Sequence, residues 1–395
     1  MEKVSEVDGI VSVTIIGGGI AGLTFAAALA QCGARASILE ARGDDVYRGG
    51  AALAMAPNAM WVFRRLGLAD KISRPGSRID RYLFVNPHGR ELKSLALSDI
   101  GHGWNEAAWA VPRAHILDTL MNALPHGTLC LNSPVTGLRW DHDAFIVESQ
   151  NRLSRHHGVL VGADGIHSIM RQALWHLPPP KYQGFFALRG IVSHTLPNSH
   201  QDTVVQVWGG AGEFGYSPLG PDRVYWFATI PWADPNQPPQ REHFLRHVHG
   251  WFDPVKRFVE NTPDDELLIH PIFDRLEPFS DRPFPATLIG DAAHLMTPNT
   301  GQGACQGIAD AWVLARELAT SREVGAALSA YRRRRLGPAL GVGRRSRQLG
   351  RIIHRRFPLG AAIKQGMLLA FPASAVVGVM REVVGSPADL GEPVC

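Results

Sequence analysis

Apolar runs of strand length lead into glycine-containing turns and helices at three places along the chain. The first strand is expected at residues 11–16 and is rich in β-branched residues; a helix at residues 23–31 and a strand at 36–40 follow it. A second such strand, at residues 159–162, enters a helix after a break in the apolar run. A third, at residues 287–289, precedes a helix expected from Gly303 to about residue 319. This alternation of strand and helix predicts an α/β fold.

The pattern changes between residues 181 and 285. Aromatic and β-branched runs there are separated by glycine, proline and aspartate, which is typical of antiparallel strands. Three prolines at residues 178–180 mark the start of this region, so we predict a substrate domain inserted into the α/β domain. The elements expected here are strands at residues 185–193, 203–208, 213–217, 224–230 and 267–273 and a helical stretch at 242–258. Upstream, residues 79–97 alternate like a hairpin.

The first strand is followed by a glycine-rich turn, and the next strand ends in an acid. Gly17, Gly19 and Gly22 follow the first strand in GxGxxG order, and Glu40 ends the next strand eighteen residues beyond Gly22. The glycines allow a tight turn and a close approach of a pyrophosphate to the helix N-terminus, and the acid is suited to ribose hydroxyls. The sequence therefore predicts a dinucleotide site.

The third strand ends in Gly290 and Asp291, and a loop rich in proline and glycine then opens the next helix at Gly301 and Gly303. A carboxylate in this position can hold a sugar-phosphate hydroxyl, and the amides at the helix start can face an anionic group. The second strand has its own acid and glycine, Asp164 and Gly165, followed by Arg171 in the helix.

These three motifs, in this order, resemble those of the class A FAD-dependent monooxygenases, the aromatic hydroxylases similar to para-hydroxybenzoate hydroxylase. The resemblance runs from residue 11 to about residue 347. It implies a Rossmann-like GxGxxG FAD domain interleaved with a largely antiparallel substrate sheet, followed by C-terminal helices. The expected divisions are an FAD segment at 10–180, a substrate domain at 181–285, a second FAD segment at 286–330 and an Arg-rich helical region at 331–395.

The resemblance also implies a set of FAD-contacting positions. The loop before Asn58 would run beside the flavin ring, and the segment before residue 114 would supply an arginine to the cofactor. The residues expected to bind FAD are Gly17, Gly19, Ile20, Ala21, Gly22, Glu40, Arg42, Gly50, Ala51, Arg113, Asp164, Asp291, Pro298, Gly301, Gly303 and Ala304.

The reaction implied is that NAD(P)H reduces FAD and that one oxygen atom of O2 passes, by way of a flavin C4a-hydroperoxide, to a small aromatic or conjugated substrate. Hydroxylation is expected first, with epoxidation and Baeyer–Villiger insertion open. Two alternatives share the fold. Residues 226–231 are similar to the WxWxIP signature of flavin-dependent halogenases, except that Ala228 replaces its second tryptophan. An FAD-dependent reductase would share the nucleotide motifs without oxygenation.

Candidate substrate and proton groups are fewer. Arg189 lies in an apolar strand, where it could anchor a substrate oxygen or form a buried ion pair. Tyr216 or Tyr225 could assist it, as a downstream tyrosine does in some family members. His294 follows the Gly-Asp motif and could act as a base or only cap the backbone. Cys305 stands where many family members have asparagine and could be redox-active or simply packed.

Charge and cysteine content limit the remaining possibilities. Ten arginines and no acid occupy residues 331–356, so the +4 net charge comes from one segment. That segment could bind an anionic membrane surface or lie as a solvated helix face over the FAD domain; nucleic acid is not expected, because no aromatic residues interleave. The four cysteines show no CxxC pair or regular spacing, so we expect no metal site and no disulfide framework. We expect a cytoplasmic protein, either monomer or homodimer.

Overall fold

The computed structural model describes residues 6–7, 10–43, 51–209, 212–355 and 360–391. Its centre is a parallel five-stranded sheet in the order β10-β4-β3-β14-β20. The strands are β3 (Val13–Ile16), β4 (Ala36–Leu39), β10 (Leu129–Cys130), β14 (Val159–Gly162) and β20 (Ala286–Leu288). Because β3, β14 and β20 are neighbours, the loops that follow them meet at the carboxyl edge of the sheet.

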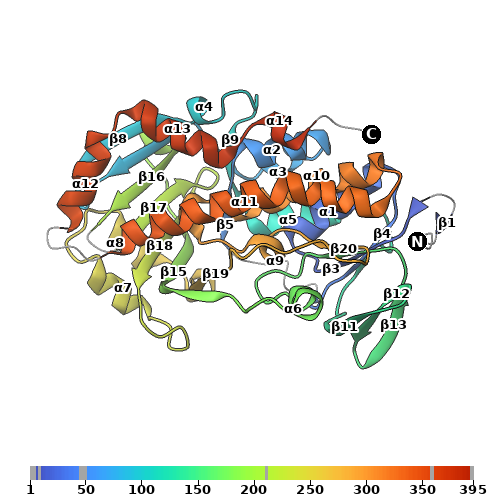
Figure 1. Ribbon diagram of the computed structural model, residues 1–395. Helices are drawn as coiled ribbons and strands as arrows, with labels where there is room; N and C mark the ends of the chain where they lie inside the picture. Colours follow the sequence, from blue (N-terminus) through green and yellow to red (C-terminus); the bar gives the residue numbers. More distant parts are fainter. Residues whose placement is uncertain (1–5, 8–9, 44–50, 210–211, 356–359, 392–395) are drawn as a thin grey trace.

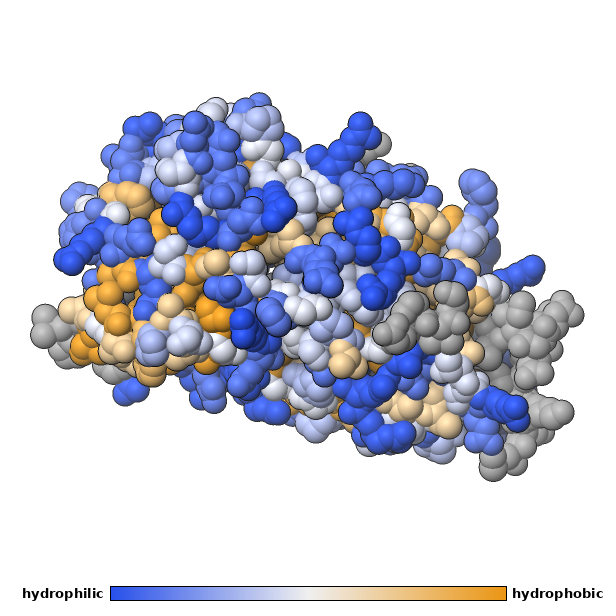
Figure 2. All heavy atoms as spheres, turned by 90° about the horizontal axis from the view of Figure 1, so that it is seen from above, coloured by the Kyte–Doolittle hydropathy of each residue, from blue (hydrophilic) through white to orange (hydrophobic). Residues whose placement is uncertain are grey.

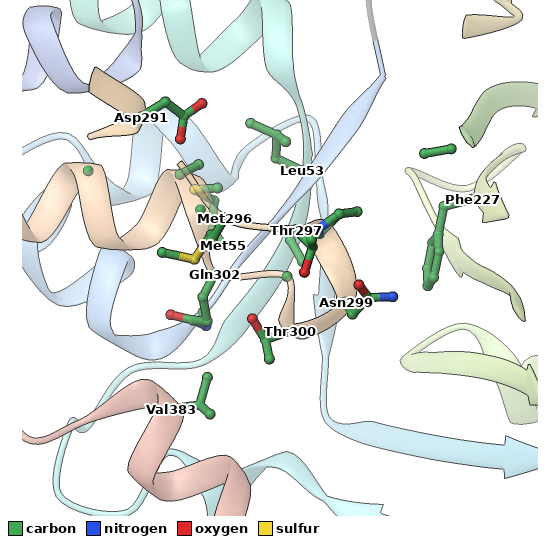
Figure 3. Close-up of a pocket in the computed structure, with 18 of the residues that line it drawn as sticks. Leu53, Met55, Phe227, Asp291, Met296, Thr297, Asn299, Thr300, Gln302 and Val383 are labelled. Atoms are coloured by element: carbon green, nitrogen blue, oxygen red, sulfur yellow. The ribbon is translucent and has the colours of Figure 1, made fainter. Parts of the chain in front are cut away.

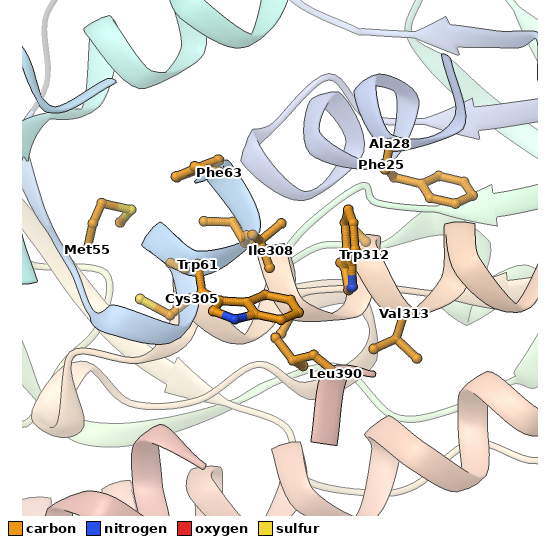
Figure 4. Close-up of a cluster of buried hydrophobic side chains, with 14 of the residues drawn as sticks. Phe25, Ala28, Met55, Trp61, Phe63, Cys305, Ile308, Trp312, Val313 and Leu390 are labelled. Atoms are coloured by element: carbon orange, nitrogen blue, oxygen red, sulfur yellow. The ribbon is translucent and has the colours of Figure 1, made fainter. Parts of the chain in front are cut away.

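Two apolar helices, α1 (Ile20–Gln31) and α10 (Gly303–Thr320), pack against each other beside this sheet. The core around them is aromatic (Figure 4). Trp61, on α2 (Pro57–Arg65), meets Trp312 edge to face with ring centroids 5.9 Å apart. α5 (Arg113–Met121) also packs against α1. The expected helices after Gly22 and from Gly303 are confirmed.

A larger sheet of seven strands forms the other half of the molecule, in the order β19-β15-β18-β17-β16-β7-β8. Neighbouring strands within this sheet pair antiparallel, except that β16 and β7 pair parallel. The strands are β7 (Arg81–Val85), β8 (Glu91–Ala96), β15 (Lys181–Ser193), β16 (Thr203–Trp208), β17 (Glu213–Pro218), β18 (Arg223–Pro231) and β19 (Leu268–Asp274). The hairpin expected at residues 79–97 thus joins this sheet, although it lies in the sequence segment assigned to the FAD domain.

Three smaller sheets and several short helices complete the fold of the described residues. A three-stranded sheet of β5 (Ala52–Met55), β9 (Ala108–Pro112) and β6 (Ser77–Ile79) lies between the two halves, and another of β11 (Val135–Asp141), β12 (Ala144–Ser149) and β13 (Arg152–His156) projects from the far end. The short helices are α3 (Ala69–Ser73), α4 (Leu97–Ile100), α6 (Ile169–Trp175) and α9 (Asp291–His294). β1 (Glu6–Val7) and β2 (Ile10–Val11) pair at the N-terminal end.

The C-terminal region is helical and spans both halves (Figure 1). α11 (Val324–His354) carries most of the arginine-rich segment, and several of its arginines pair with acids of the body: Arg335 with Asp310 at 2.9 Å, and Arg334 with Glu317 at 3.1 Å. α12 (Gly360–Ala370), α13 (Ala373–Val384) and α14 (Pro387–Leu390) follow. The α/β fold with an interleaved antiparallel sheet and C-terminal helices is confirmed.

Two expectations are wrong. The helical stretch at residues 242–258 is broken into α7 (Arg241–His247) and α8 (Val255–Asn261), because Gly250 adopts a positive φ of 79° and Pro254 cannot continue a helix from the preceding residues. Cys32 is disulfide-bonded, whereas Cys130 and Cys305 are free thiols.

Candidate active site

A cavity of about 1200 Å³ lies between the carboxyl edge of the five-stranded sheet and one face of the seven-stranded sheet. Figure 3 shows Asp291 at one side of it and Phe227 at the other, with Val383 of α13 below. Pockets for one small ligand usually measure about 300–1,000 Å³, so this one has room for a cofactor and a second molecule.

The glycine-rich turn forms one end of the cavity. Gly17 has a φ of 104°, and a Cβ on it would lie 2.4 Å from the Ala163 carbonyl oxygen. A Cβ on Gly22 would lie 2.1 Å from the Gly17 carbonyl oxygen, so this glycine supports the turn from behind. No side chain caps the start of α1, which leaves its first amides available to an anion. The residues of the motif that line the cavity are Gly17, Gly19, Ile20 and Ala21.

Glu40 and Arg42 close the turn. The Glu40 carboxylate accepts hydrogen bonds from the Gly18 amide at 2.6 Å and the Arg42 amide at 3.0 Å, and it pairs with the Arg42 guanidinium at 3.1 Å. Both side chains line the cavity. The acid that the sequence assigns to ribose therefore also fixes the glycine-rich backbone.

The Gly-Asp loop lines the cavity beside this turn. Asp291 follows Gly290, whose φ is 59°. The Asp291 side chain is exposed to the cavity, but the cavity itself is surrounded by protein, and this burial raises the pKa of the Asp291 carboxyl. No side chain caps the start of α10, so the amides there are also available to a ligand. The expected residues of this loop that line the cavity are Asp291, Pro298, Gly301, Gly303 and Ala304.

Asp164 lines the cavity between these two loops. Its Oδ2 accepts a hydrogen bond from the Met170 amide at 3.0 Å, while its buried Oδ1 has no partner among the described residues. Burial raises the pKa of this carboxyl. Arg171, in contrast, donates to the backbone carbonyls of Ala292 and Ala293, so it braces α9 and does not line the cavity.

Three further cofactor expectations have mixed outcomes. Arg113, at the start of α5, lines the cavity. Ala51 is buried and does not line the cavity, whereas its neighbour Ala52 does. Gly50 lies outside the described residues.

FAD fits this end of the cavity. Two uncapped helix starts point their amides at it, and the cradle at Gly17 has no room for a Cβ. Asp291 and the unpartnered Asp164 Oδ1 supply acceptors for hydroxyl groups. An adenosine diphosphate and a ribityl chain need this combination of free amides and carboxylates.

The other end of the cavity is one face of the seven-stranded sheet. Arg189 on β15 and Tyr225 and Phe227 on β18 line it. Among the described residues no carboxylate pairs with Arg189, so its guanidinium is available to an oxygen of a ligand. Burial raises the pKa of Tyr225, and the charge of Arg189 acts in the opposite direction.

Tyr216 does not fit the role expected of it. It alternates with Gly215 and Ser217 on β17, and it points into the hydrophobic core behind the sheet, where it is 1% exposed. Its hydroxyl lies 3.3 Å from His200 Nδ1, away from the cavity. Of the two tyrosines that the sequence left open, Tyr225 is the one that reaches the cavity.

His294 also lies outside the lining. Its Nε2 is 2.5 Å from Asp310 Oδ2 in a buried cluster. The same carboxylate accepts from the Gly290 amide at 2.9 Å and pairs with Arg335. Burial works to raise the pKa of Asp310, but the charges of His294 and Arg335 outweigh it and hold that pKa below its ordinary value. This cluster fixes the Gly-Asp turn, which explains why His294 follows it.

Cys305 is a packed core residue. It is fully buried, its Sγ lies 3.6 Å from the Ala54 carbonyl oxygen, and burial raises its pKa to about 11. Figure 4 shows it between Met55 and Trp61. A thiol with so high a pKa is a poor nucleophile, so the packing interpretation is favoured over a redox role.

One polar group in the cavity was missed from the sequence. Glu213, 3% exposed, accepts hydrogen bonds from Gln206 and from Asn299 Nδ2, the latter at 3.0 Å, and Tyr82 donates to the same glutamine at 2.5 Å. Burial raises the pKa of Glu213 to about 7. These residues come from three strands and a short 3-10 helix (Pro298–Thr300), so no local motif signals them.

The fold and the cavity define a flavoprotein enzyme. The family described as FAD binding domain matches residues 10–345. Aurachin C monooxygenase/isomerase of Stigmatella aurantiaca is 34% identical over 86% of this chain and 89% of its own length. A 3-amino-4-hydroxybenzoate 2-monooxygenase of Streptomyces platensis is 32% identical over 87% of this chain and 88% of its own. The chain belongs to this family, and it is a class A FAD-dependent monooxygenase.

Solved structures agree on the fold. Klebsiella pneumoniae HpxO complexed with FAD and uric acid superposes with a TM-score of 0.84 over 95% of this chain and 97% of that one, at 23% identity. Family membership favours the monooxygenase over the halogenase and reductase alternatives.

Proposed function

We propose that this monooxygenase uses NAD(P)H and O2 to hydroxylate a small aromatic or conjugated compound held between the flavin and the seven-stranded sheet. The observation that carries the proposal is that one cavity joins the three nucleotide motifs to Arg189 and Tyr225. Relatives named for an aminohydroxybenzoate and a structure containing uric acid support a ring-shaped substrate with polar substituents.

Bound FAD supplies electron transfer and oxygen activation, which no side chain can provide. The chain supplies position. Asp291 and the first amides of α1 and α10 would hold the cofactor at the carboxyl edge of the parallel sheet. The aromatic face around Phe227 keeps the reacting end of the cavity apolar and so limits water.

Arg189 and Tyr225 orient the substrate. The guanidinium binds an oxygen of the ring substituent, which favours its anionic form, and the Tyr225 hydroxyl donates a second hydrogen bond. An anionic oxygen makes an aromatic ring richer in electrons and a better target for oxygen transfer. Glu213 lines the cavity, and its pKa, which burial raises to about 7, suits it to hold or release a proton there, while the hydrogen bonds from Gln206 and Asn299 fix its position.

The proposal is tested with FAD-reconstituted protein, a panel of phenols, quinolones and purines, NADH or NADPH, and ¹⁸O2. The expected product carries one ¹⁸O atom and forms in step with reductant use. Reductant consumption that never leads to labelled product with any compound would contradict the proposal and favour a reductase.

A further inference from the structure

Large apolar side chains are exposed at the C-terminal end of the chain. Seven such side chains are exposed in the described residues, and six of them lie on α11, α12, α13 or the turn between the last two. Figure 2 shows hydrophobic atoms gathered over this part of the molecule. The six, called here the C-terminal patch, are Ile352, Ile363, Met367, Leu369, Phe371 and Val379. Their clustering matters, because single exposed apolar residues are common whereas contiguous patches mark interaction sites.

The two helices of the patch have membrane-like composition but the wrong shape to span. In the described residues no single helix is long and apolar enough to cross a membrane. The segments Ala361–Ala370 and Ala373–Leu390 together have the length and apolar composition of a membrane span, but they are bent by 94° relative to each other. A span needs about 20 apolar residues in one helix. Two short helices at a right angle can instead lie in the plane of a membrane surface.

The cavity opens through the patch. Ile352, Met367, Phe371 and Val379 are exposed and also line the cavity. A second copy of the chain on this surface would close the opening. A lipid surface would leave it facing a phase from which an apolar compound can enter.

Cationic side chains border the patch. Arg351 is exposed beside Ile352, and Lys93 donates to the Phe371 carbonyl oxygen at 2.5 Å. Arg381 on α13 donates to the Asp99 carbonyl oxygen, while the adjacent Glu382 is neutralised by Arg345. This border complements anionic lipid headgroups.

We propose that the C-terminal patch docks on the surface of an anionic lipid bilayer, with the cavity mouth toward the lipid. Docking does not depend on the reaction catalysed. Entry of a substrate with an apolar substituent from the lipid rests on the proposed function.

Docking is tested by flotation of the full-length FAD-loaded protein with vesicles of phosphatidylcholine alone or with a quarter phosphatidylglycerol. Wild type is expected to float with the anionic vesicles, less with the neutral ones, and less at high salt. Ile363→Ser/Leu369→Ser should lower the partition coefficient by at least about tenfold, because it removes two apolar side chains from the contact. Lys93→Gln and Arg351→Gln should each lower it about fivefold on anionic vesicles only.

The matched control is Leu153→Ser on β13, at the opposite end of the molecule (Figure 1), where the side chain is 70% exposed. It should float as wild type does. Neither Ile363 nor Leu369 lines the cavity, so flavin content and melting temperature of that variant should match wild type. Wild type that stays in the dense fraction with every vesicle would overturn the proposal, as would a dimer that Ile363→Ser/Leu369→Ser dissociates without any vesicle binding. Failure of oxygen insertion would leave flotation unchanged, so the two proposals fail separately.

Discussion

The two ends of the cavity are built on different principles. The cofactor end is made of backbone at the carboxyl edge of a parallel sheet, where tight turns at Gly17 and Gly290 are accompanied by the starts of α1 and α10, whose amides no side chain caps. The substrate end is made of side chains on antiparallel strands, where alternate residues such as Ser217 and Tyr216 face opposite ways. Substitutions at the first end should act through backbone space and FAD affinity. Those at the second should act through individual side-chain groups.

The largest effect is expected at the glycine-rich turn. Gly22→Ala places a Cβ 2.1 Å from a backbone oxygen that cannot move aside, so we expect a loss of about 3 kcal/mol of stability and of FAD binding. The matched control is Gly19→Ala, because a Cβ there meets nothing within 4 Å. Urea unfolding of the FAD-free proteins should separate the two variants; equal stability would mean that the turn is not as tight as described.

A loss of stability of comparable size is expected from Glu213, on the seven-stranded sheet, but only as the pH rises. Its pKa is raised from 4.5 to about 7 by burial, so the folded state holds this proton more tightly than the unfolded state. Its contribution to stability is therefore complete below pH 4.5 and is lost as pH rises through 7, by roughly 3 kcal/mol.

Glu213→Gln cannot lose a proton, and Asn299 has an unpartnered Oδ1 that can turn to accept from the new amide. The difference in melting temperature between this variant and wild type should therefore shift in favour of the variant from pH 5 to pH 8. A constant difference across that range would show that Glu213 has an ordinary pKa.

Asp291→Ala should weaken FAD binding by about 10- to 100-fold, since it removes a charged acceptor from the cofactor. The seven-stranded sheet should be unaffected. Titration of the free proteins with FAD, followed by flavin fluorescence, measures the change. Equal FAD affinities for wild type and variant would show that Asp291 does not contribute to binding the cofactor.

Three variants of the substrate end should leave FAD affinity unchanged and differ in turnover. Arg189→Ala is expected to lower kcat/KM by roughly 100-fold and to uncouple reductant use from product. Tyr225→Phe should lower kcat/KM about tenfold, because it removes one hydrogen bond to the substrate. Tyr216→Phe is the control and should leave turnover unchanged, because that hydroxyl faces away from the cavity. If Tyr216→Phe is the more damaging tyrosine variant, the face assignment of β17 is wrong.

The cofactor end was predictable because its chemistry is local. Gly17, Glu40 and Asp291 each follow a short strand of the parallel sheet, and parallel strands bring such turns to one edge. The substrate end was less predictable, because a shift of one residue in register turns every side chain to the other face. Sequence spacing could not choose between Tyr216 and Tyr225. Glu213 and the Asp310 cluster around His294 depend on contacts between distant segments, which leave no local pattern.

The most direct test of the account is the flavin absorption band near ~450 nm, a property of the cofactor, in the reconstituted protein under anaerobic NADPH or NADH. The account predicts a bound oxidised flavin whose bleaching is accelerated by an aromatic substrate in wild type and in Tyr216→Phe, but not in Arg189→Ala. A protein that takes up no FAD would contradict the cofactor end. Bleaching that is equally fast with and without every candidate substrate would contradict a cavity in which the sheet presents the substrate to the flavin.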